Sequence, residues 1–189
     1  MNTLFPLEPI FPPGFNYLPD FISEEEEAQL INAIFKIELH PFQFQGYEAK
    51  RKVASFGYDW NFDMKSLAKG KMIPEAFHPL IEKISKHLLI NKDDVAELLV
   101  TEYTVGSVIN WHRDAPPFDL IAGISLLSHS VFRLRPFNKE KQTRSSVISF
   151  PLKSRSLYIM QGASRTDWQH SIAAVDKVRY SITLRTLKA

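Results

Sequence analysis

The chain has 189 residues, of which 44% are hydrophobic, 12% aromatic and 23% charged, and its formal net charge is +2. This composition is typical of a globular protein and argues against a disordered or low-complexity chain. The length is sufficient for one domain with a full hydrophobic core. The chain contains no cysteine, which excludes disulfide scaffolds, thiolate zinc sites and cysteine nucleophiles.

Targeting signals are not evident in the sequence. The longest apolar runs are far shorter than the roughly 20 residues of a membrane span, and the first 22 residues lack the basic segment and apolar run of a signal peptide. We therefore expect a cytoplasmic protein with no membrane partner, and we interpret the chain as a monomer.

Positive charge is concentrated in two windows of the chain. Residues 49–71 contain six Lys or Arg against two acids, and residues 133–155 contain seven against one. Local basic patches on an otherwise acidic chain favour an anionic partner such as nucleic acid. Two solvated lysine-rich loops would give the same counts, so charge alone leaves both interpretations open.

Two helices are predicted in the first half of the chain. Ser23 and Glu26 form a capping-box pattern ahead of an apolar stripe with helical spacing. A second helix is predicted to open at Pro74 and Glu75, because proline is tolerated in the first turn. Its apolar face would consist of Phe77, Leu80, Ile81, Ile84 and Leu88. Residues 91–94 are expected to form a turn or the start of a short helix.

Between the two helices lies a basic run followed by alternating aromatic residues. The basic run is Lys50, Arg51 and Lys52, and the aromatic residues are Phe56, Tyr58, Trp60 and Phe62. On a strand these four aromatic side chains would share one face. Aromatic rings beside Lys and Arg can stack an extruded base and hold phosphate, whereas a core stripe is the simpler structural interpretation. We expect Phe56 and Phe62 to be buried, and Tyr58 or Trp60 to face a site.

From residue 98 onward the pattern is typical of strands. The predicted strands are residues 98–104, 107–113, 119–127, 130–136, 145–151, 155–161, 168–174 and 178–186. Closely spaced short strands without intervening helices favour an antiparallel sandwich or jelly roll. We predict an α+β, mainly β fold: a double-stranded β-helix (jelly roll) with N-terminal helices packed outside. It would form a single domain over residues 1–189, with residues 98–189 as the jelly-roll core and residues 1–97 as the N-terminal part.

A metal site is indicated by two histidines and one aspartate. His112 and Asp114 are two residues apart, so on a strand their side chains point to the same face. His170 on a later strand supplies a third ligand. Two histidines and one carboxylate match the facial triad of non-haem Fe(II) oxygenases, which leaves coordination positions open. A zinc site with the same three ligands is the competing interpretation.

The last predicted strand has a complete alternation. Arg179, Ser181, Thr183 and Arg185 would lie on one face, and Tyr180, Ile182 and Leu184 on the other. If the apolar face packs toward the helices, the polar face lines a cavity. A buried arginine requires an anion, because leaving it unpaired costs several kcal/mol. Two such arginines could bracket a dicarboxylate such as 2-oxoglutarate, although an exposed edge strand would show the same alternation.

These motifs resemble the AlkB family of Fe(II)- and 2-oxoglutarate-dependent dioxygenases. The resemblance extends over nearly the whole chain, with specific motifs in residues 98–188. It rests on His112-x-Asp114, on His170, on Tyr103, and on Arg179-x5-Arg185 in the form RYSITLR. It implies an enzyme that uses Fe(II), 2-oxoglutarate and O2, in which His112, Asp114 and His170 hold the iron.

The resemblance also implies roles around the co-substrate. Arg179 would pair with the distal carboxylate of 2-oxoglutarate, helped by Tyr103 and Ser181. Arg185 would lie near the metal-bound end of the co-substrate and could also contact Asp114, which would orient this ligand. Thr101 stands where the founding member has an asparagine that contacts the co-substrate.

For the substrate, the resemblance implies oxidative demethylation of alkylated bases in DNA or RNA. The region that corresponds to the basic and aromatic segment forms a lid in that family, so the expected substrate-binding residues are Tyr58, Trp60, Lys50, Arg51 and, from the second basic window, Arg133. Arg133 and Arg135 share a strand face and would either contact phosphates or line the cavity mouth. Pro116 replaces an acidic residue that reads the damaged base in the founding member. Two alternatives remain: the same chemistry on a protein side chain or small molecule, and a non-catalytic metal-binding jelly-roll module.

Overall fold

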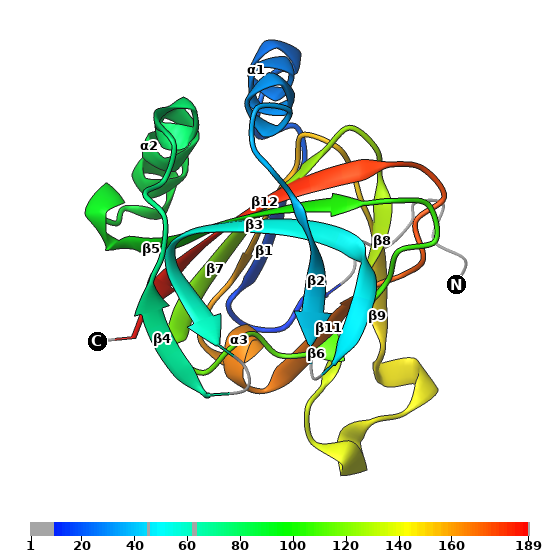
Figure 1. Cartoon of the computed structure of the whole chain (residues 1–189). Coiled ribbons are helices and arrows are strands. Elements are labelled where there is room, and N and C mark those ends of the chain that lie inside the picture. Colours follow the sequence, from blue (N-terminus) through cyan, green and yellow to red (C-terminus); the bar gives the residue numbers. More distant parts are fainter. Residues whose placement is uncertain (1–9, 45, 62–63, 189) are drawn as a thin grey trace.

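The computed structural model describes residues 10–44, 46–61 and 64–188. Two antiparallel sheets face each other, and two helices pack outside the larger sheet (Figure 1). The larger sheet has the order β1-β10-β7-β12-β5-β3-β2, with β4 paired to β3, and the smaller sheet has the order β6-β11-β8-β9. The prediction of a mainly β jelly roll with helices outside is confirmed.

The strands predicted after residue 98 correspond in order to β5 through β12. The strand bounds are β1 Phe15–Leu18, β2 His40–Phe44, β3 Tyr47–Asn61, β4 Ser66–Lys69, β5 Val95–Tyr103, β6 Ile109–His112, β7 Phe118–Leu126, β8 Ser130–Pro136, β9 Ile148–Leu152, β10 Leu157–Met160, β11 Trp168–Ile172 and β12 Arg179–Leu187. β9 begins later than predicted because Arg144–Ser146 form a 3-10 turn (η4), in which the Thr143 side chain accepts a hydrogen bond from the Ser146 amide. Another 3-10 turn, η3, spans Lys139–Lys141.

The two principal helices begin near their predicted positions. Helix α1 spans Glu24–Ile34, and Ser23 and Glu26 form the predicted capping box. Helix α2 spans His78–Leu88 and follows a 3-10 turn, η1, at Glu75–Phe77. A third 3-10 turn, η2, spans Lys92–Asp94, and the short helix α3 spans Ala163–Thr166. No helix in the described part of the chain is long and apolar enough to cross a membrane.

Two hydrophobic cores flank the larger sheet. The helix-side core joins Ile34 of α1 and Leu80 and Ile84 of α2 to strand residues such as Ile182 and Leu184. The second core lies between the sheets and includes Tyr103, Phe118, Ile121, Phe132, Leu134 and Tyr158. Strand β12 separates the two cores, with its apolar side chains toward the helices as the alternation predicted. Its polar side chains are therefore held on the inner face of the jelly roll.

The long strand β3 changes partner at Gly57. Up to this residue β3 pairs with β5, and beyond it with β4. Gly57 has φ +86°, and an added Cβ would lie 2.2 Å from the carbonyl oxygen of Ala96, so only glycine fits there without displacement. The prediction that all these aromatic side chains share one face is wrong for Phe56 and Trp60, because the irregularity at Gly57 breaks the strand alternation between them. Phe56 packs in the helix-side core as predicted, whereas Trp60 packs against the core between the sheets. The predicted burial of Phe62 concerns a residue outside the described ranges.

Candidate metal and co-substrate site

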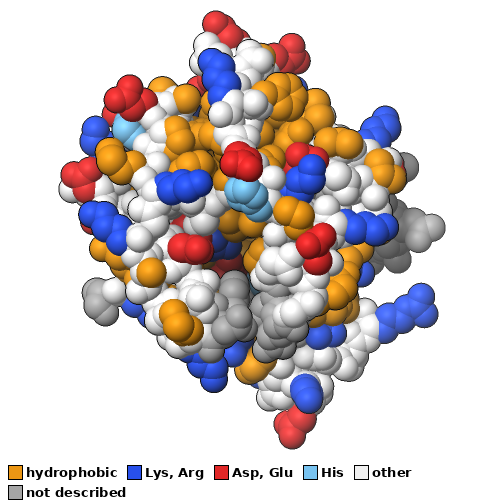
Figure 2. All heavy atoms as spheres, viewed as in Figure 1, with side chains coloured by type: hydrophobic (Ala, Val, Ile, Leu, Met, Phe, Trp, Pro, Cys, Tyr) orange, Lys and Arg blue, Asp and Glu red, His pale blue; other side chains and the backbone are white. Residues whose placement is uncertain are grey.

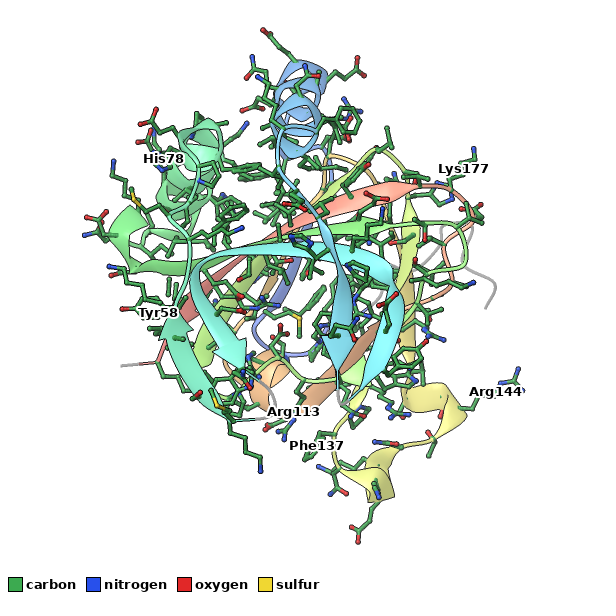
Figure 3. The ribbon with its side chains drawn as sticks, in the orientation of Figure 1. Tyr58, His78, Arg113, Phe137, Arg144 and Lys177 are labelled. Carbon is green, nitrogen blue, oxygen red and sulfur yellow. The ribbon has the colours of Figure 1, made fainter. Side chains whose placement is uncertain are left out.

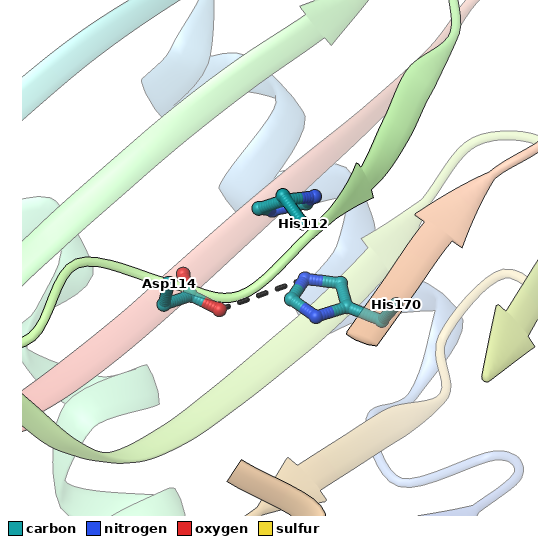
Figure 4. A group of neighbouring side chains, drawn as sticks. All are labelled: His112, Asp114 and His170. Carbon is teal, nitrogen blue, oxygen red and sulfur yellow. Dashed lines mark ion pairs between the residues drawn. The ribbon is translucent and has the colours of Figure 1, made fainter. Parts of the chain in front are cut away.

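Three side chains from the smaller sheet and its adjoining loop converge at one end of the inner core. His112 ends β6, Asp114 follows in the loop, and His170 on β11 lies directly opposite His112 in the strand register. One ligand atom from each residue can be chosen so that all three lie within 4.8 Å of one another. Figure 4 shows the three side chains pointing toward a common point, with His170 Nε2 3.5 Å from Asp114 Oδ2.

The contacts of these residues leave ligand atoms available. His112 Nδ1 lies 2.8 Å from the carbonyl oxygen of Asn110, so a proton on Nδ1 is donated there and Nε2 remains available for a metal. Asp114 Oδ2 is buried and has no hydrogen-bond partner among the described residues. Such an orphaned carboxylate oxygen beside two imidazoles fits a divalent metal ion.

The protonation states also suit metal binding. Burial lowers the pKa of His170 to about 3, reinforced by the neighbouring His112, and burial likewise lowers the pKa of His112. Burial would raise the pKa of Asp114, but Arg185 and the two histidines outweigh it, so that this pKa lies well below its usual range. At neutral pH the group therefore consists of two neutral imidazoles and one carboxylate, the forms that ligate metals.

Arg185 fixes the orientation of Asp114. Its Nε and Nη2 donate to Asp114 Oδ1 at 3.0 and 2.6 Å, and its Nη1 donates to Glu97 Oε2 at 2.5 Å. Glu97 in turn accepts a hydrogen bond from Ser55. Although burial opposes the charge, Glu97 and Asp114 raise the pKa of Arg185. Of the two roles that the resemblance implied for Arg185, the structure shows the contact with Asp114, which leaves Oδ2 facing His170.

At the other end of β12, Arg179 is a buried cation with unpartnered donors. Its side chain is 1% exposed. Nη2 donates to Ser125 Oγ, whereas Nε and Nη1 have no hydrogen-bond partner in the described part of the chain. The guanidinium lies 4.3 Å from the centroid of the Tyr103 ring, and the Tyr103 hydroxyl lies 3.4 Å from Ser181 Oγ. Thr101 is buried opposite Ser181 in the register of β5 and β12. A carboxylate is the chemical group that such a cradle fits, because it accepts bidentate hydrogen bonds from arginine.

A cavity of about 1250 Å³ opens over the metal group. The molecular surface is hollowed on this face (Figure 2), and the cavity exceeds the roughly 300–1,000 Å³ of usual ligand pockets. It is lined on the inner side by Thr101, Tyr103, His112, Asp114, His170, Thr183 and Arg185, and on the lid side by residues of β2 and β3, including Phe42, Lys50, Arg51 and Trp60.

The residues predicted to bind substrate fall in two places. Lys50, Arg51 and Trp60 line the cavity, and the Arg51 guanidinium lies 4.0 Å from the centroid of the Phe42 ring. Tyr58 is 37% exposed and lies outside the cavity lining, near the outer edge of the lid (Figure 3). Arg133 is on the outer face of the smaller sheet, where its guanidinium lies 5.1 Å from the centroid of the Trp111 ring.

Three buried polar residues near the site were not predicted. Glu97 partners Arg185, as described above. Arg165 donates from Nη2 to the carbonyl oxygens of Asp114, Ala115 and Phe118, at 3.0, 2.6 and 3.1 Å. Tyr158 packs against Gly123, and burial raises its pKa to about 12. Glu97 could have been predicted as a buried acid, because it stands inside the apolar run VAELLV. The role of Arg165 could not have been predicted, because its hydrogen-bond partners lie about 50 positions away in the sequence.

Comparisons with known proteins agree with this geometry. A family model described as "2OG-Fe(II) oxygenase superfamily" matches residues 14–185. The mouse protein named "tRNA (carboxymethyluridine(34)-5-O)-methyltransferase ALKBH8" is 30% identical over 168 residues, which cover 85% of this chain and 24% of the mouse protein. The Arabidopsis thaliana protein named "Alkylated DNA repair protein ALKBH8 homolog" is 28% identical over 199 residues, covering 92% of this chain and 55% of the relative. The chain thus spans about a quarter to a half of the length of these relatives.

A solved structure described as "The structure of OsALKBH1" superposes with a TM-score of 0.72 at 16% identity. The match covers 94% of this chain and 98% of that one. At this identity the likeness concerns the fold alone, and it agrees with the jelly roll described above.

Proposed function

Because the chain belongs to the 2OG-Fe(II) oxygenase superfamily, and within it to the AlkB family, we propose that this dioxygenase demethylates alkylated bases in DNA or RNA. The observation that carries the proposal is the group of the half-buried His112 and the buried side chains of Asp114 and His170 in the lining of a cavity of about 1250 Å³. A cavity of this size has room for an extruded base.

In this proposal the inner face of the jelly roll binds the iron and the co-substrate. His112, Asp114 and His170 hold Fe(II), and Arg179 binds the distal carboxylate of 2-oxoglutarate. When bound, iron with 2-oxoglutarate and O2 supplies the oxidation, in which the co-substrate is converted to succinate and CO2 and the hydroxylated methyl group leaves as formaldehyde. Arg185 holds Asp114 in its ligating orientation, which is the usual role of a residue that donates hydrogen bonds to a metal ligand.

Tyr103, Ser181 and Thr101 complete the co-substrate cradle. Tyr103 lies against the Arg179 guanidinium and close to the Ser181 hydroxyl. Thr101 is the buried neighbour of Ser181 on the adjacent strand. These residues exclude water around the carboxylate that Arg179 binds, so that the ion pair forms in a low-dielectric surrounding.

The lid supports a nucleic-acid substrate. Trp60 offers an aromatic surface for an extruded base, and Lys50 and Arg51 place positive charge beside it. Arg51 has no acidic partner among the described residues, and Pro116 provides no carboxylate near the metal group. The cavity lining also carries the carboxylates of Glu38 and Asp59, so the charge of the lid does not by itself choose between a neutral methylated base and a cationic one such as 1-methyladenine or 3-methylcytosine. The printed names of the mouse and Arabidopsis relatives concern tRNA and alkylated DNA, which also supports a nucleic-acid substrate.

The experiment that tests this proposal is a substrate panel. Purified protein with Fe(II), ascorbate and 2-oxoglutarate is incubated with single- and double-stranded DNA and RNA that carry 1-methyladenine, 3-methylcytosine or N6-methyladenine, and with unmodified controls. Formaldehyde and succinate are followed together. Equal amounts of both products on a methylated oligonucleotide are the expected result.

Two other outcomes contradict the proposal in different ways. Succinate formed at the same rate with and without every oligonucleotide indicates a protein or small-molecule substrate. Neither product, with iron bound, indicates a non-catalytic metal-binding module. The predictions of a cytoplasmic monomer, and of a division near residue 97 within a single domain, stay predictions.

A further inference from the structure

The outer face of the smaller sheet carries two arginines that the sheet itself holds in place. Arg133 Nε donates to Ser171 Oγ at 2.9 Å, and Arg135 Nε donates to Gln169 Oε1 at 2.8 Å. In each case the partner is the residue directly opposite on β11. Trp111 lies beside both arginines, with their guanidinium carbons 5.1 and 4.5 Å from the centroid of its ring.

A third arginine is fixed in a similar way nearby. Arg113 stacks on Phe137, with 3.6 Å between its guanidinium carbon and the ring centroid, and its Nη1 donates to the carbonyl oxygen of Thr166 at 2.7 Å. Figure 3 shows Arg113 and Phe137 side by side at the lower end of the molecule, with Arg144 farther out on the loop between β8 and β9. We call Arg113, Arg133 and Arg135 the arginine track.

The positive charges of the arginine track are not neutralised by acidic side chains in the described part of the chain. None of the three arginines forms an ion pair with an acid in the described ranges, and the Nη groups of Arg133 and Arg135 have no hydrogen-bond partner there. The adjoining loop adds Lys139, Lys141 and Arg144 against one acid, Glu140. Fixed guanidinium groups with free donors are suited to bind an external anion, because less side-chain entropy is lost when the anion binds.

The spacing and the location of the track indicate which anion. Arg133 and Arg135 are two residues apart on one strand, so their Cα atoms are roughly 7 Å apart, a separation that can serve neighbouring phosphates of one nucleic-acid strand. Trp111 and Arg113 also line the cavity, so the track begins at the cavity mouth. A base must leave the stack to enter such a cavity, and the free energy needed to extrude it is smallest in a single strand, where no base pair has to be broken.

We propose that the arginine track binds successive phosphates of a single-stranded nucleic acid whose alkylated base occupies the cavity. This inference rests on the proposed function and specifies its substrate as single-stranded. The contacts position the strand and read no sequence, because they reach only phosphates. The lid then selects the base, and the track holds the backbone next to it.

The test measures how binding of a short fluorescent single-stranded oligonucleotide depends on salt. Each phosphate contact contributes about 0.7 to the slope of log K against log salt for single strands. The double variant Arg133→Gln/Arg135→Gln is therefore expected to lower this slope by about 1.4 and to weaken binding at low salt at least tenfold. Arg133→Lys/Arg135→Lys restores most of the slope, because the charge is kept.

The matched control is Lys86→Gln/Lys92→Gln, which removes the same charge at the end of α2 and in the following turn, on the helix side of the molecule. This control leaves the slope unchanged, and thermal melting verifies that all variants are folded. Equal slopes for the track variant and the control overturn the inference, as does tighter binding of a duplex of the same sequence. If the wild-type protein demethylates the oligonucleotide and the slopes are equal, the track is wrong and the proposed function stands. If the slope falls as expected and no oligonucleotide is demethylated, the track stands and the proposed function fails.

Discussion

The floor and the lid of the cavity are built in opposite ways. On the floor, Arg185 donates hydrogen bonds to the buried carboxylates of both Asp114 and Glu97. Glu97 and Arg185 stand on β5 and β12, which are paired on both sides, and Asp114 follows the edge strand β6 of the smaller sheet. The lid consists of β2 at the edge of the larger sheet and the outer part of β3, and its β4 pairs only with β3. The floor is therefore fixed before any ligand binds, whereas the lid has fewer constraints. We therefore expect iron and co-substrate binding, which the family shares, to depend on the floor, and we expect substrate selection to depend on the lid.

The largest effect is expected from removing the carboxylate on the floor. Asp114→Ala should abolish succinate formation, because the metal loses its anionic ligand and Arg185 loses a partner. Iron binding and succinate yield measure the loss, and circular dichroism checks that the fold is retained. Turnover near the wild-type rate would mean that the iron site lies elsewhere.

The next effect concerns the buried cation at the far end of β12. Arg179→Gln should weaken 2-oxoglutarate binding about 100-fold or more, because a buried charge pair to a carboxylate is worth about 3 kcal/mol. Isothermal titration calorimetry with 2-oxoglutarate measures this effect. Lys188→Gln near the end of β12 is the control and should not alter the affinity. An unchanged affinity in Arg179→Gln would remove Arg179 from the co-substrate site.

A smaller effect is expected where the floor supports a ligand without touching the metal. Arg185→Gln leaves Asp114 without its strongest partner, and loss of such support typically costs about 10–100-fold in metal affinity. Glu97→Gln weakens the support of Arg185 and should cost less than Arg185→Gln. Metal competition assays give both affinities, and the reverse order would contradict a positioning role that runs from Glu97 through Arg185 to Asp114.

The free energy of unfolding of the metal-free protein should also depend on pH. The unfolded chain has an ordinary histidine pKa near 6.5, whereas burial lowers the pKa of His170 to about 3 in the fold. The unfolded state therefore binds more protons below pH 6.5, and stability is lost as pH falls from about 6.5 toward 3, by up to about 1.4 kcal/mol per pH unit. Urea unfolding in the presence of a chelator should show a shallower pH dependence in His170→Gln than in the exposed-site control His78→Gln. Equal slopes would contradict the neutral, buried state of His170.

The smallest effect is expected in the lid. Arg51→Gln should raise KM for a methylated oligonucleotide only a few-fold and leave 2-oxoglutarate affinity unchanged, because the half-buried Arg51 side chain is far less constrained than the floor. Arg51→Glu should in addition shift preference toward the cationic 3-methylcytosine. A change in 2-oxoglutarate affinity equal to the change in KM would show that the lid and the floor are not separate.

The sequence predicted the floor well because strand alternation specifies it. The pairing of β6 with β11 places His112 directly opposite His170, and Asp114 follows two residues after His112. The polar side chains of β12 lie on its inner face, as the alternation predicted. The jelly roll follows from the same short alternating strands. Long-range partners gave a weaker signal or none: the three carbonyl oxygens bound by Arg165 depend on how distant loops pack.

The lid was predicted less well for a local reason. Four aromatic residues at alternate positions predicted one strand face. The positive φ of Gly57 and the change of partner strand instead place Phe56 and Trp60 in different cores. Arg133 likewise had two open interpretations, and the burial of its neighbours Phe132 and Leu134 in the core between the sheets places it on the outer face. Periodicity defines regular strands and fails where a strand is bent.

The most direct test of the floor is an anaerobic calorimetric titration of 2-oxoglutarate into the protein loaded with Fe(II). We predict one molecule bound per chain, with an affinity that falls sharply both when iron is omitted and when Arg179 is replaced by Gln, because the co-substrate position that we propose extends from the metal group to Arg179. Binding that is the same without iron and in Arg179→Gln would contradict the assignment of this inner face as the oxygenase centre.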